Sequence, residues 1–195
     1  MKKSKTTVKK CRIVVMGDSG VGKTSLISQL LGNGCPKEHE ETVEEMYHSE
    51  LRMPAAKYNL EILDTTGAYS FPAMRRLAIN KADVFVLVFA VDSPDSLKYL
   101  KNLREEILEL REDARSKIIV AANKTDSLGT DKTVTSDEHT ATMVSLDWDC
   151  ACVETSAKND LGVMDLFETA VSLVHSEGSP SLSPLSSLDE CSREC

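Results

Sequence analysis

Residues 17–25, GDSGVGKTS, contain three glycines, a lysine and the two hydroxyl residues that follow it. The spacing Gly-x-x-x-x-Gly-Lys-Thr, between a strand-like and a helix-like run, is typical of a loop that cradles phosphates. The glycines let the backbone curl and point its N–H groups inward, and the N-terminus of the following helix adds positive potential. We predict phosphate binding by Asp18, Ser19, Gly20, Val21, Gly22, Lys23, Thr24 and Ser25.

Two residues of this loop carry the most specific chemistry. The ammonium group of Lys23 is expected to reach the β- and γ-phosphates, and the hydroxyl of Thr24 to bind Mg²⁺ as a cofactor. The loop alone does not identify the nucleotide, because small kinases and ATPases share it.

Two later segments, NKTD at 123–126 and ETSAK at 154–158, indicate guanine. Each follows an apolar strand-like run, and open α/β sheets bind ligands at the carboxyl ends of their strands. Guanine presents a ring N–H and an exocyclic amine, which the carboxylate of Asp126 can accept together; adenine would leave that carboxylate unpaired. The predicted base site comprises Asn123, Lys124, Asp126, Ser156, Ala157 and Lys158.

Alternating strand-like and helix-like segments must position these loops. Runs such as VFVLVFAV do not alternate in polarity, which is typical of strands buried on both faces of a parallel sheet. We therefore predict an α/β fold with a doubly wound sheet. Strands are predicted at 11–16, 58–63, 84–91, 118–122 and 150–153, and 46–63 is interpreted as two strands around a turn. Helices are predicted after Gly22, from Ser93-Pro94, at 136–146 and at 161–174.

The segments GDSGVGKTS, DTTG, NKTD and ETSAK resemble the nucleotide motifs of Ras-superfamily small GTPases, over about residues 8–175. Segments 62–79, 103–113 and 146–158 are most similar to the Ras-dva branch, close to the dexamethasone-induced Ras-like proteins. The resemblance implies a P-loop NTPase fold, with a mostly parallel six-stranded sheet, one antiparallel strand and helices on both faces. It also implies a switch between GDP and GTP that signals and hydrolyses GTP.

The resemblance further implies roles for residues that contact the metal and the γ-phosphate. Asp64 would hold Mg²⁺ through water, Thr42 would bind Mg²⁺ and the γ-phosphate, and the N–H of Gly67 would meet the γ-phosphate. The implied catalytic positions are Lys23, Thr42, Gly67 and Ala68.

Ala68 departs from the family pattern, which has a glutamine at this position to orient the attacking water. Alanine has no side-chain donor or acceptor, so we expect slow intrinsic hydrolysis.

The implied effector region spans residues 39–47. Its two glutamates at 44 and 45 would present acidic groups to a basic effector, and an effector strand could extend the hairpin edge; a solvated acidic loop is the alternative. An exchange factor and an activating protein are further expected partners of a monomeric chain. The region consists of His39, Glu40, Glu41, Thr42, Val43, Glu44, Glu45, Met46 and Tyr47.

The termini differ from the central domain at 8–175. A lysine-rich arm at 1–7 and a Ser-rich acidic tail at 176–195 are expected to be flexible. The net charge of −8 argues against nucleic acid as a partner. No apolar run approaches the roughly 18 residues of a membrane span, so a cytoplasmic location is expected. The lysine arm alone supports only weak membrane contact, whereas a lipid on Cys191 or Cys195 would place the chain at the cytoplasmic face of the plasma membrane.

Two other functions remain open on the sequence. A P-loop kinase would need a lid and a substrate pocket and would leave NKTD unexplained. A nucleotide-bound scaffold that never cycles is consistent with Ala68.

Overall fold

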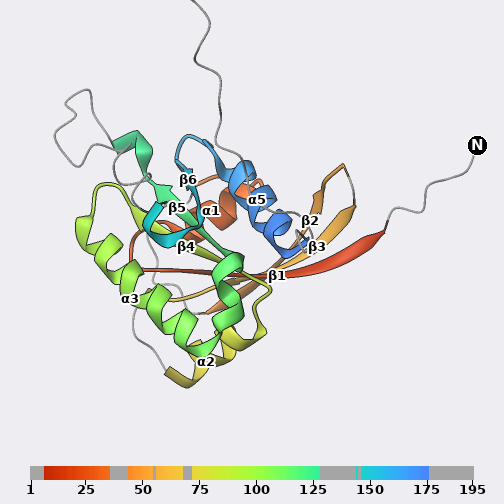
Figure 1. Cartoon of the computed structure of the whole chain (residues 1–195). Helices are drawn as coiled ribbons and strands as arrows, with labels where there is room; N and C mark the ends of the chain where they lie inside the picture. Colours follow the sequence, from red (N-terminus) through yellow and green to blue (C-terminus); the bar gives the residue numbers. More distant parts are fainter. Residues whose placement is uncertain are drawn as a thin grey trace, which may run out of the picture.

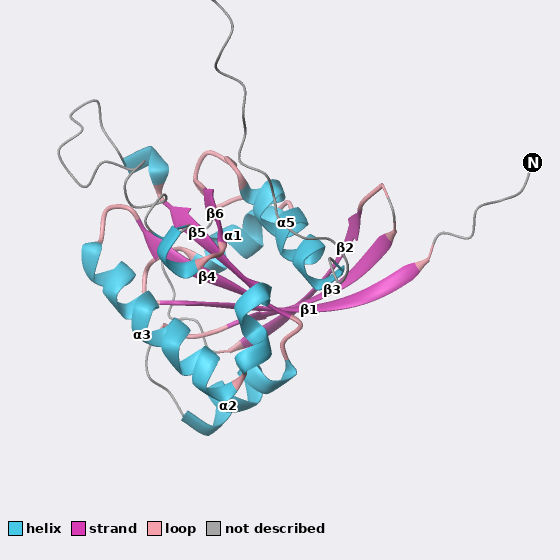
Figure 2. Cartoon of the chain, in the orientation of Figure 1, coloured by secondary structure: helices cyan, strands magenta, loops and turns pink. Residues whose placement is uncertain are grey.

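The fold is described from a computed structural model of the chain (Figures 1 and 2). The structure describes residues 7–35, 44–54, 56–67, 72–127, 144 and 146–175. Six strands form one sheet in the order β2-β3-β1-β4-β5-β6, with β2 antiparallel to β3 and the other neighbours parallel, as predicted. The strands are β1 (Val8–Gly17), β2 (Glu45–Arg52), β3 (Lys57–Asp64), β4 (Val84–Ala90), β5 (Ile118–Asn123) and β6 (Ala151–Glu154).

Helices cover both faces of this sheet (Figure 2). One buried cluster joins Cys11 and Ile13 of β1 to helices α1 (Lys23–Leu30) and α5 (Val163–His175). A second cluster joins Val14 of β1 to α2 (Pro72–Lys81) and α3 (Pro94–Leu110). Since successive side chains of a strand point to opposite faces, the unbroken apolar runs supply both clusters, which confirms the doubly wound arrangement.

The helix ends follow local sequence signals in α3. The Ser93 hydroxyl accepts a hydrogen bond from the Ser96 N–H at 3.4 Å, and Pro94 occupies the first helical position. Serine before proline is a favoured helix start, because the serine oxygen satisfies a free N–H and proline lacks one.

Two parts of the helix prediction differ from the structure. Helix α2 was not predicted, because it buries only Ala78 and Ile79 and therefore lacks an apolar stripe. The helix predicted at 136–146 lies mostly outside the described residues. The described residues in and just after this segment, 144 and 146–148, are helical. The short 3-10 helices η1 (Glu112–Lys117) and η2 (Thr125–Ser127) precede and follow β5. Within the part of the chain that the structure describes, none of the helices has both the length and the apolar character needed to cross a bilayer.

Candidate functional site

The phosphate loop joins β1 to α1 and curls around the side chain of Lys23. Its Nζ donates hydrogen bonds to the carbonyl oxygens of Gly17 at 3.1 Å and Asp18 at 2.7 Å, and the residue is only 6% exposed. Burial lowers the pKa of Lys23 to about 8, against the raising influence of Asp64 and Asp18. The ammonium group therefore lies inside the loop at the N-terminus of α1, a position that attracts anions.

Two glycines allow backbone segments to approach this loop closely. Gly22 has φ +98°, and a Cβ there would collide with the side-chain amide of Asn123. A Cβ on Gly67, which follows β3, would collide with the backbone of Asp18 and Ser19. The DTTG segment thus lies directly against the phosphate loop, which only glycine permits.

A threonine and an aspartate meet beneath the loop. The Thr24 hydroxyl donates to Oδ2 of Asp64 at 2.6 Å, and Asp64 is fully buried. Its other oxygen, Oδ1, has no hydrogen-bond partner among the described residues. Burial raises the pKa of Asp64, while the Thr24 hydroxyl and the Lys23 ammonium group lower it. A buried carboxylate oxygen without a donor is costly, so this position suits a cation or a water bound to one.

The side chain of Asn123, at the end of β5, ties three loops together. Its Nδ2 donates to the carbonyl of Val21 in the phosphate loop at 2.9 Å. Its Oδ1 accepts from the Thr155 hydroxyl and from the Ala157 N–H, each at 3.2 Å, in the loop after β6. Asn123 is only 1% exposed, so it acts by holding these loops in fixed relative positions.

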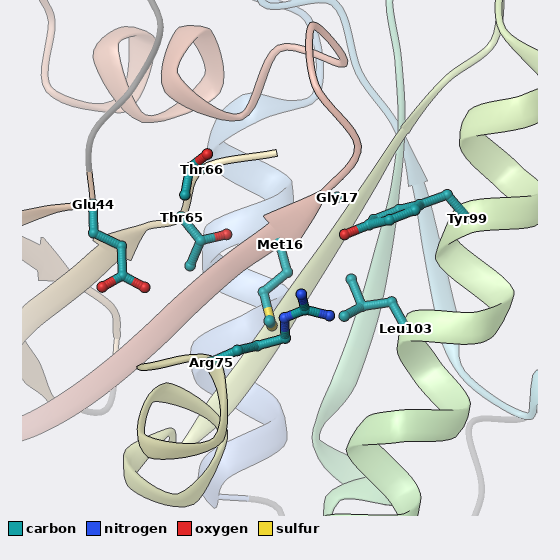
Figure 3. A pocket seen from close by; sticks show the side chains of 8 residues that line it. All are labelled: Met16, Gly17, Glu44, Thr65, Thr66, Arg75, Tyr99 and Leu103. Atoms are coloured by element: carbon teal, nitrogen blue, oxygen red, sulfur yellow. The ribbon is translucent and has the colours of Figure 1, made fainter. Parts of the chain in front are cut away.

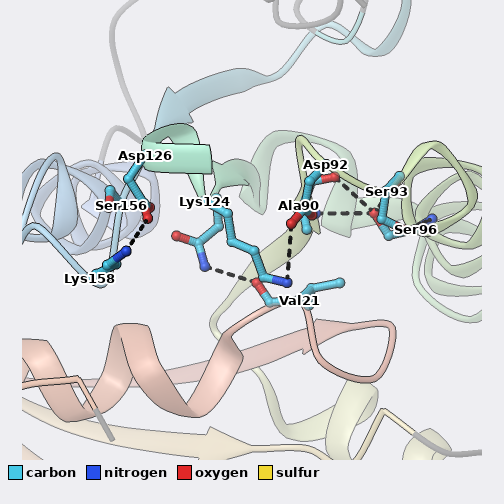
Figure 4. A network of polar contacts seen from close by, with 10 residues as sticks. Val21, Ala90, Asp92, Ser93, Ser96, Lys124, Asp126, Ser156 and Lys158 are labelled. Carbon is cyan, nitrogen blue, oxygen red and sulfur yellow. Dashed lines mark hydrogen bonds and ion pairs between the residues drawn. The ribbon is translucent and has the colours of Figure 1, made fainter. Parts of the chain in front are cut away.

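Asp126 presents a carboxylate next to this junction (Figure 4). Its Oδ1 accepts from the Ser156 hydroxyl at 2.6 Å, and Nζ of Lys158 lies 3.6 Å from Oδ2. The Ser156 hydroxyl, more than Lys158, holds the pKa of Asp126 below its usual value despite burial. The carboxylate is therefore ionised at neutral pH and can accept N–H groups from a ligand.

Lys124 lies between these two residues in the sequence. Its backbone is left-handed, with φ +66°, and its Nζ lies 3.7 Å from Oδ2 of Asp92. Asp92 follows β4, so the end of this strand contributes to the site as well.

The structure brings the phosphate loop, Asp64, Gly67 and the two base segments to the carboxyl ends of the parallel strands, as predicted. Thr42, Ala68 and residues 39–43 lie outside the described residues. Of the effector region, Glu44 precedes β2, and Glu45, Met46 and Tyr47 begin it at the sheet edge. Glu44 also lines a small cavity of about 20 Å³ between β1, α2 and α3 (Figure 3), with Met16, Gly17, Thr65, Thr66, Arg75, Tyr99 and Leu103.

Two residues with structural roles at the site were not predicted. Thr155 lies within the quoted ETSAK segment, yet its bond to Asn123 spans 32 positions and leaves no local pattern. Asp92 belongs to the VDSPDS turn, where an aspartate is an ordinary loop residue.

Comparison with known proteins agrees with this geometry. The chain is 35% identical over 170 residues to the GTP-binding protein Rhes of Mus musculus, covering 83% of this chain and 64% of Rhes. It is 37% identical over 163 residues to the GTP-binding protein Di-Ras2 of Mus musculus, and 35% to Di-Ras1 of Homo sapiens, covering 83% of this chain and 80% of each relative. The chain thus spans less than two thirds of Rhes but most of both Di-Ras proteins. The Ras family model matches residues 12–176, and with the shared fold this shows that the chain belongs to the Ras family.

Proposed function

We propose that the chain binds GDP and GTP, hydrolyses GTP and acts as a signalling switch. The observation that carries the proposal is the ionised carboxylate of Asp126, held by Ser156 at the same sheet edge as the Lys23 ammonium group. The carboxylate suits the two N–H donors of guanine, and the ammonium group suits a phosphate. Relatives named as GTP-binding proteins support this combination.

Isothermal titration calorimetry with GDP, GTP and ATP tests this proposal. We expect tight binding of both guanine nucleotides in the presence of magnesium and negligible binding of ATP, because adenine would leave Asp126 buried without its partners. Equal affinity for ATP would contradict the proposal, and so would failure to bind any of the three nucleotides.

The residues around Asp64 fit a magnesium ion, whose preferred ligands are oxygens. Thr24 would hold it directly and Asp64 through water, and Oδ1 of Asp64 would gain in that water the hydrogen-bond donor that the described residues do not supply. When bound, the ion would neutralise charge on the β- and γ-phosphates. We expect chelation by EDTA to accelerate GDP release from the wild-type chain, and to accelerate it less in Asp64→Asn. An equal acceleration in both proteins would exclude Asp64 as a ligand.

The switch would act through the segment that follows β3. Because the backbone of Gly67 lies against Ser19 of the phosphate loop, a γ-phosphate bound in the loop would lie close to the DTTG segment. Helix α2 begins only a few residues later, so gain or loss of that phosphate would be passed to α2 and to partners that contact it. Effectors, an exchange factor and an activating protein are the classes of partner this requires.

We also propose that Ala68 makes intrinsic hydrolysis slow. Restoring an oriented water in Ala68→Gln is expected to accelerate single-turnover GTP hydrolysis by up to about 100-fold. Ala68→Met, of similar length but without an amide, is the matched control and should remain slow. If the wild-type chain already hydrolyses GTP as fast as Ala68→Gln, the proposal is wrong; if neither protein turns over, the scaffold function is favoured.

A finer placement in the Ras-dva branch, near the dexamethasone-induced Ras-like proteins, is part of this proposal and rests on segments 62–79, 103–113 and 146–158. A cytoplasmic location with weak membrane contact is proposed on the lysine arm and the two cysteines at 191 and 195. Intact mass of the protein from its native cell would show whether either cysteine carries a lipid.

A further inference from the structure

Lys124 occupies a demanding position in the base segment. It adopts a left-handed backbone conformation between Asn123 and Asp126, where a side chain other than glycine is uncommon. Its four-carbon stem is flexible, and ordering such a side chain costs conformational entropy. A lysine that is to cover a ligand with its stem therefore benefits from a fixed partner for its ammonium group.

We propose that Asp92 is a positioning residue for Lys124: its carboxylate anchors the ammonium group, keeps the methylene stem over the base site and so slows the release of the nucleotide. The inference rests on the proposed function and adds a residue to that site. The ion pair has Nζ of Lys124 3.7 Å from Oδ2 of Asp92, with side chains 37% and 42% exposed (Figure 4).

The backbone on both sides of Asp92 is anchored. Before it, the Val91 N–H donates to the carbonyl of Asn123 at 2.9 Å, which joins the β4–α3 turn directly to the base segment. After it, the Ser93 N–H donates to the carbonyl of Ala90 at 2.9 Å. The backbone that carries Asp92 is thus positioned by Asn123, the same residue that holds the loops of the site together.

A buried serine fixes this turn further. The Ser96 hydroxyl donates to the carbonyl of Ser93 at 2.6 Å and accepts from the Ala90 N–H at 3.1 Å, and Ser96 is only 1% exposed. The turn is therefore a rigid support. Because the side chain of Asp92 is short, its carboxylate is held in a nearly constant position.

The other acidic group of the base segment is already engaged. Asp126 accepts from Ser156 and lies near Lys158, so its carboxylate is aimed at the loop after β6. Among the described residues, the ion pair recorded for Lys124 is the one with Asp92. Lys124 therefore has an anion of its own, separate from the carboxylate of Asp126.

The test measures release of fluorescent GDP from the full chain after addition of excess unlabelled GDP. Asp92→Asn keeps the size and removes the charge, and we expect release to be about two- to five-fold faster, the range an exposed ion pair supplies. Asp92→Glu should restore much of the wild-type rate. In a Lys124→Met background, which keeps an unbranched stem without charge, Asp92→Asn should have no further effect.

Asp95→Asn is the matched control, because Asp95 lies three residues from Asp92, in the first turn of α3, and pairs with Lys98 on the exposed surface. It removes the same charge and should leave the release rate unchanged. The inference would be overturned if GDP release from Asp92→Asn were unchanged or slower. It would also be overturned if Asp92→Asn accelerated release equally with and without the Lys124 charge. Either result would leave the proposed function intact. Failure of the wild-type chain to bind GDP would instead overturn the proposed function, and this inference with it.

Discussion

Asp126 shows how one side chain can select a base through its ionisation. A neutral carboxyl group would itself be a donor and would face the two donors of guanine, so recognition requires the charged form. The Ser156 hydroxyl stabilises that form, which is why the pKa of Asp126 lies below its usual value although the side chain is only 14% exposed. Under the proposed function, the serine of ETSAK would therefore act on the base through the aspartate of NKTD.

Asp126→Asn tests this at the residue scale. The amide loses the charge-assisted bonds and turns a donor toward the donors of guanine, so we expect affinity for GDP to fall by about 100-fold. Xanthine carries a carbonyl where guanine carries the amine, and the same amide can donate to it. Competition against fluorescent GDP should show the variant gaining affinity for xanthine nucleotide while the control Asp165→Asn, on the exposed start of α5, does not. A variant that keeps wild-type preference for GDP would exclude Asp126 from base recognition.

Some residues of the site could be predicted because their chemistry lies within one short pattern. Lys23 follows its glycines directly, and Asp126 lies three positions from Asn123, so both were found from spacing alone. The contact between Thr24 and Asp64 crosses 40 positions, and that of Asn123 with Val21 crosses 102. Such contacts depend on the sheet register, which no local pattern encodes.

At the scale of elements, Arg111 connects the end of α2 to the sheet. Its Nη1 donates to the carbonyl oxygens of Ile79, in the last turn of α2, at 3.1 Å and of Ala82, just after α2, at 2.5 Å. Its Nη2 donates to Asp113 at 2.7 Å, and its guanidinium lies 5.8 Å from the ring centre of Phe85. A helix that buries only two residues is thus held by polar tertiary contacts, those of Arg111 and the ion pair of Arg75 with Glu106 at 2.8 Å.

Arg111→Ala is expected to destabilise the chain by about 2–3 kcal/mol, because it removes hydrogen bonds to two carbonyls, leaves that of Ala82 without its arginine donor and removes the cation–π contact. Arg111→Lys keeps the positive charge but lacks the planar guanidinium, so its free energy of unfolding should lie between those of the wild type and Arg111→Ala. Urea unfolding measures the free energy of unfolding of both variants. Lys98→Ala, which breaks an exposed pair with Asp95, is the control and should change stability by less than about 0.5 kcal/mol. A similarly small change in Arg111→Ala would show that α2 does not depend on this residue.

Elements with their own buried apolar pattern could be predicted from the sequence, whereas an element held by tertiary contacts could not. Strands β4 and β5 are buried along their whole length, so their composition alone identifies them. Helix α3 has a serine–proline start and an apolar stripe that includes Leu100, Leu103 and Ile107. Helix α2 lacks an apolar stripe, and Met74 and Leu77 are exposed on it. Tertiary contacts such as those of Arg111 stabilise it, and these appear only once the sheet is assembled.

At the scale of the whole molecule, the ionisation of Cys11 is tied to global unfolding. Cys11 lies on β1, in the interior of the sheet, and is fully buried. Burial, with a smaller contribution from Asp83, raises the pKa of its thiol from about 9 to about 12. The folded state therefore keeps the neutral thiol at a pH at which the unfolded chain has already released the proton. Stabilisation from this group is complete below about pH 9 and is lost as the pH rises toward 12.

We accordingly expect the free energy of unfolding of the wild-type chain to fall faster with rising pH than that of Cys11→Ala, by up to about 1.4 kcal/mol per pH unit above pH 9. At neutral pH the variant is the less stable protein because of the small cavity it creates, so the gap between the two should narrow at alkaline pH. Burial also raises the pKa of the Cys150 and Cys152 thiols, to about 11 and about 12, but both remain in the two proteins and cancel in the comparison. Urea unfolding between pH 7 and pH 11 measures the gap. Parallel curves would mean that Cys11 ionises without unfolding, and that the centre of the sheet admits water.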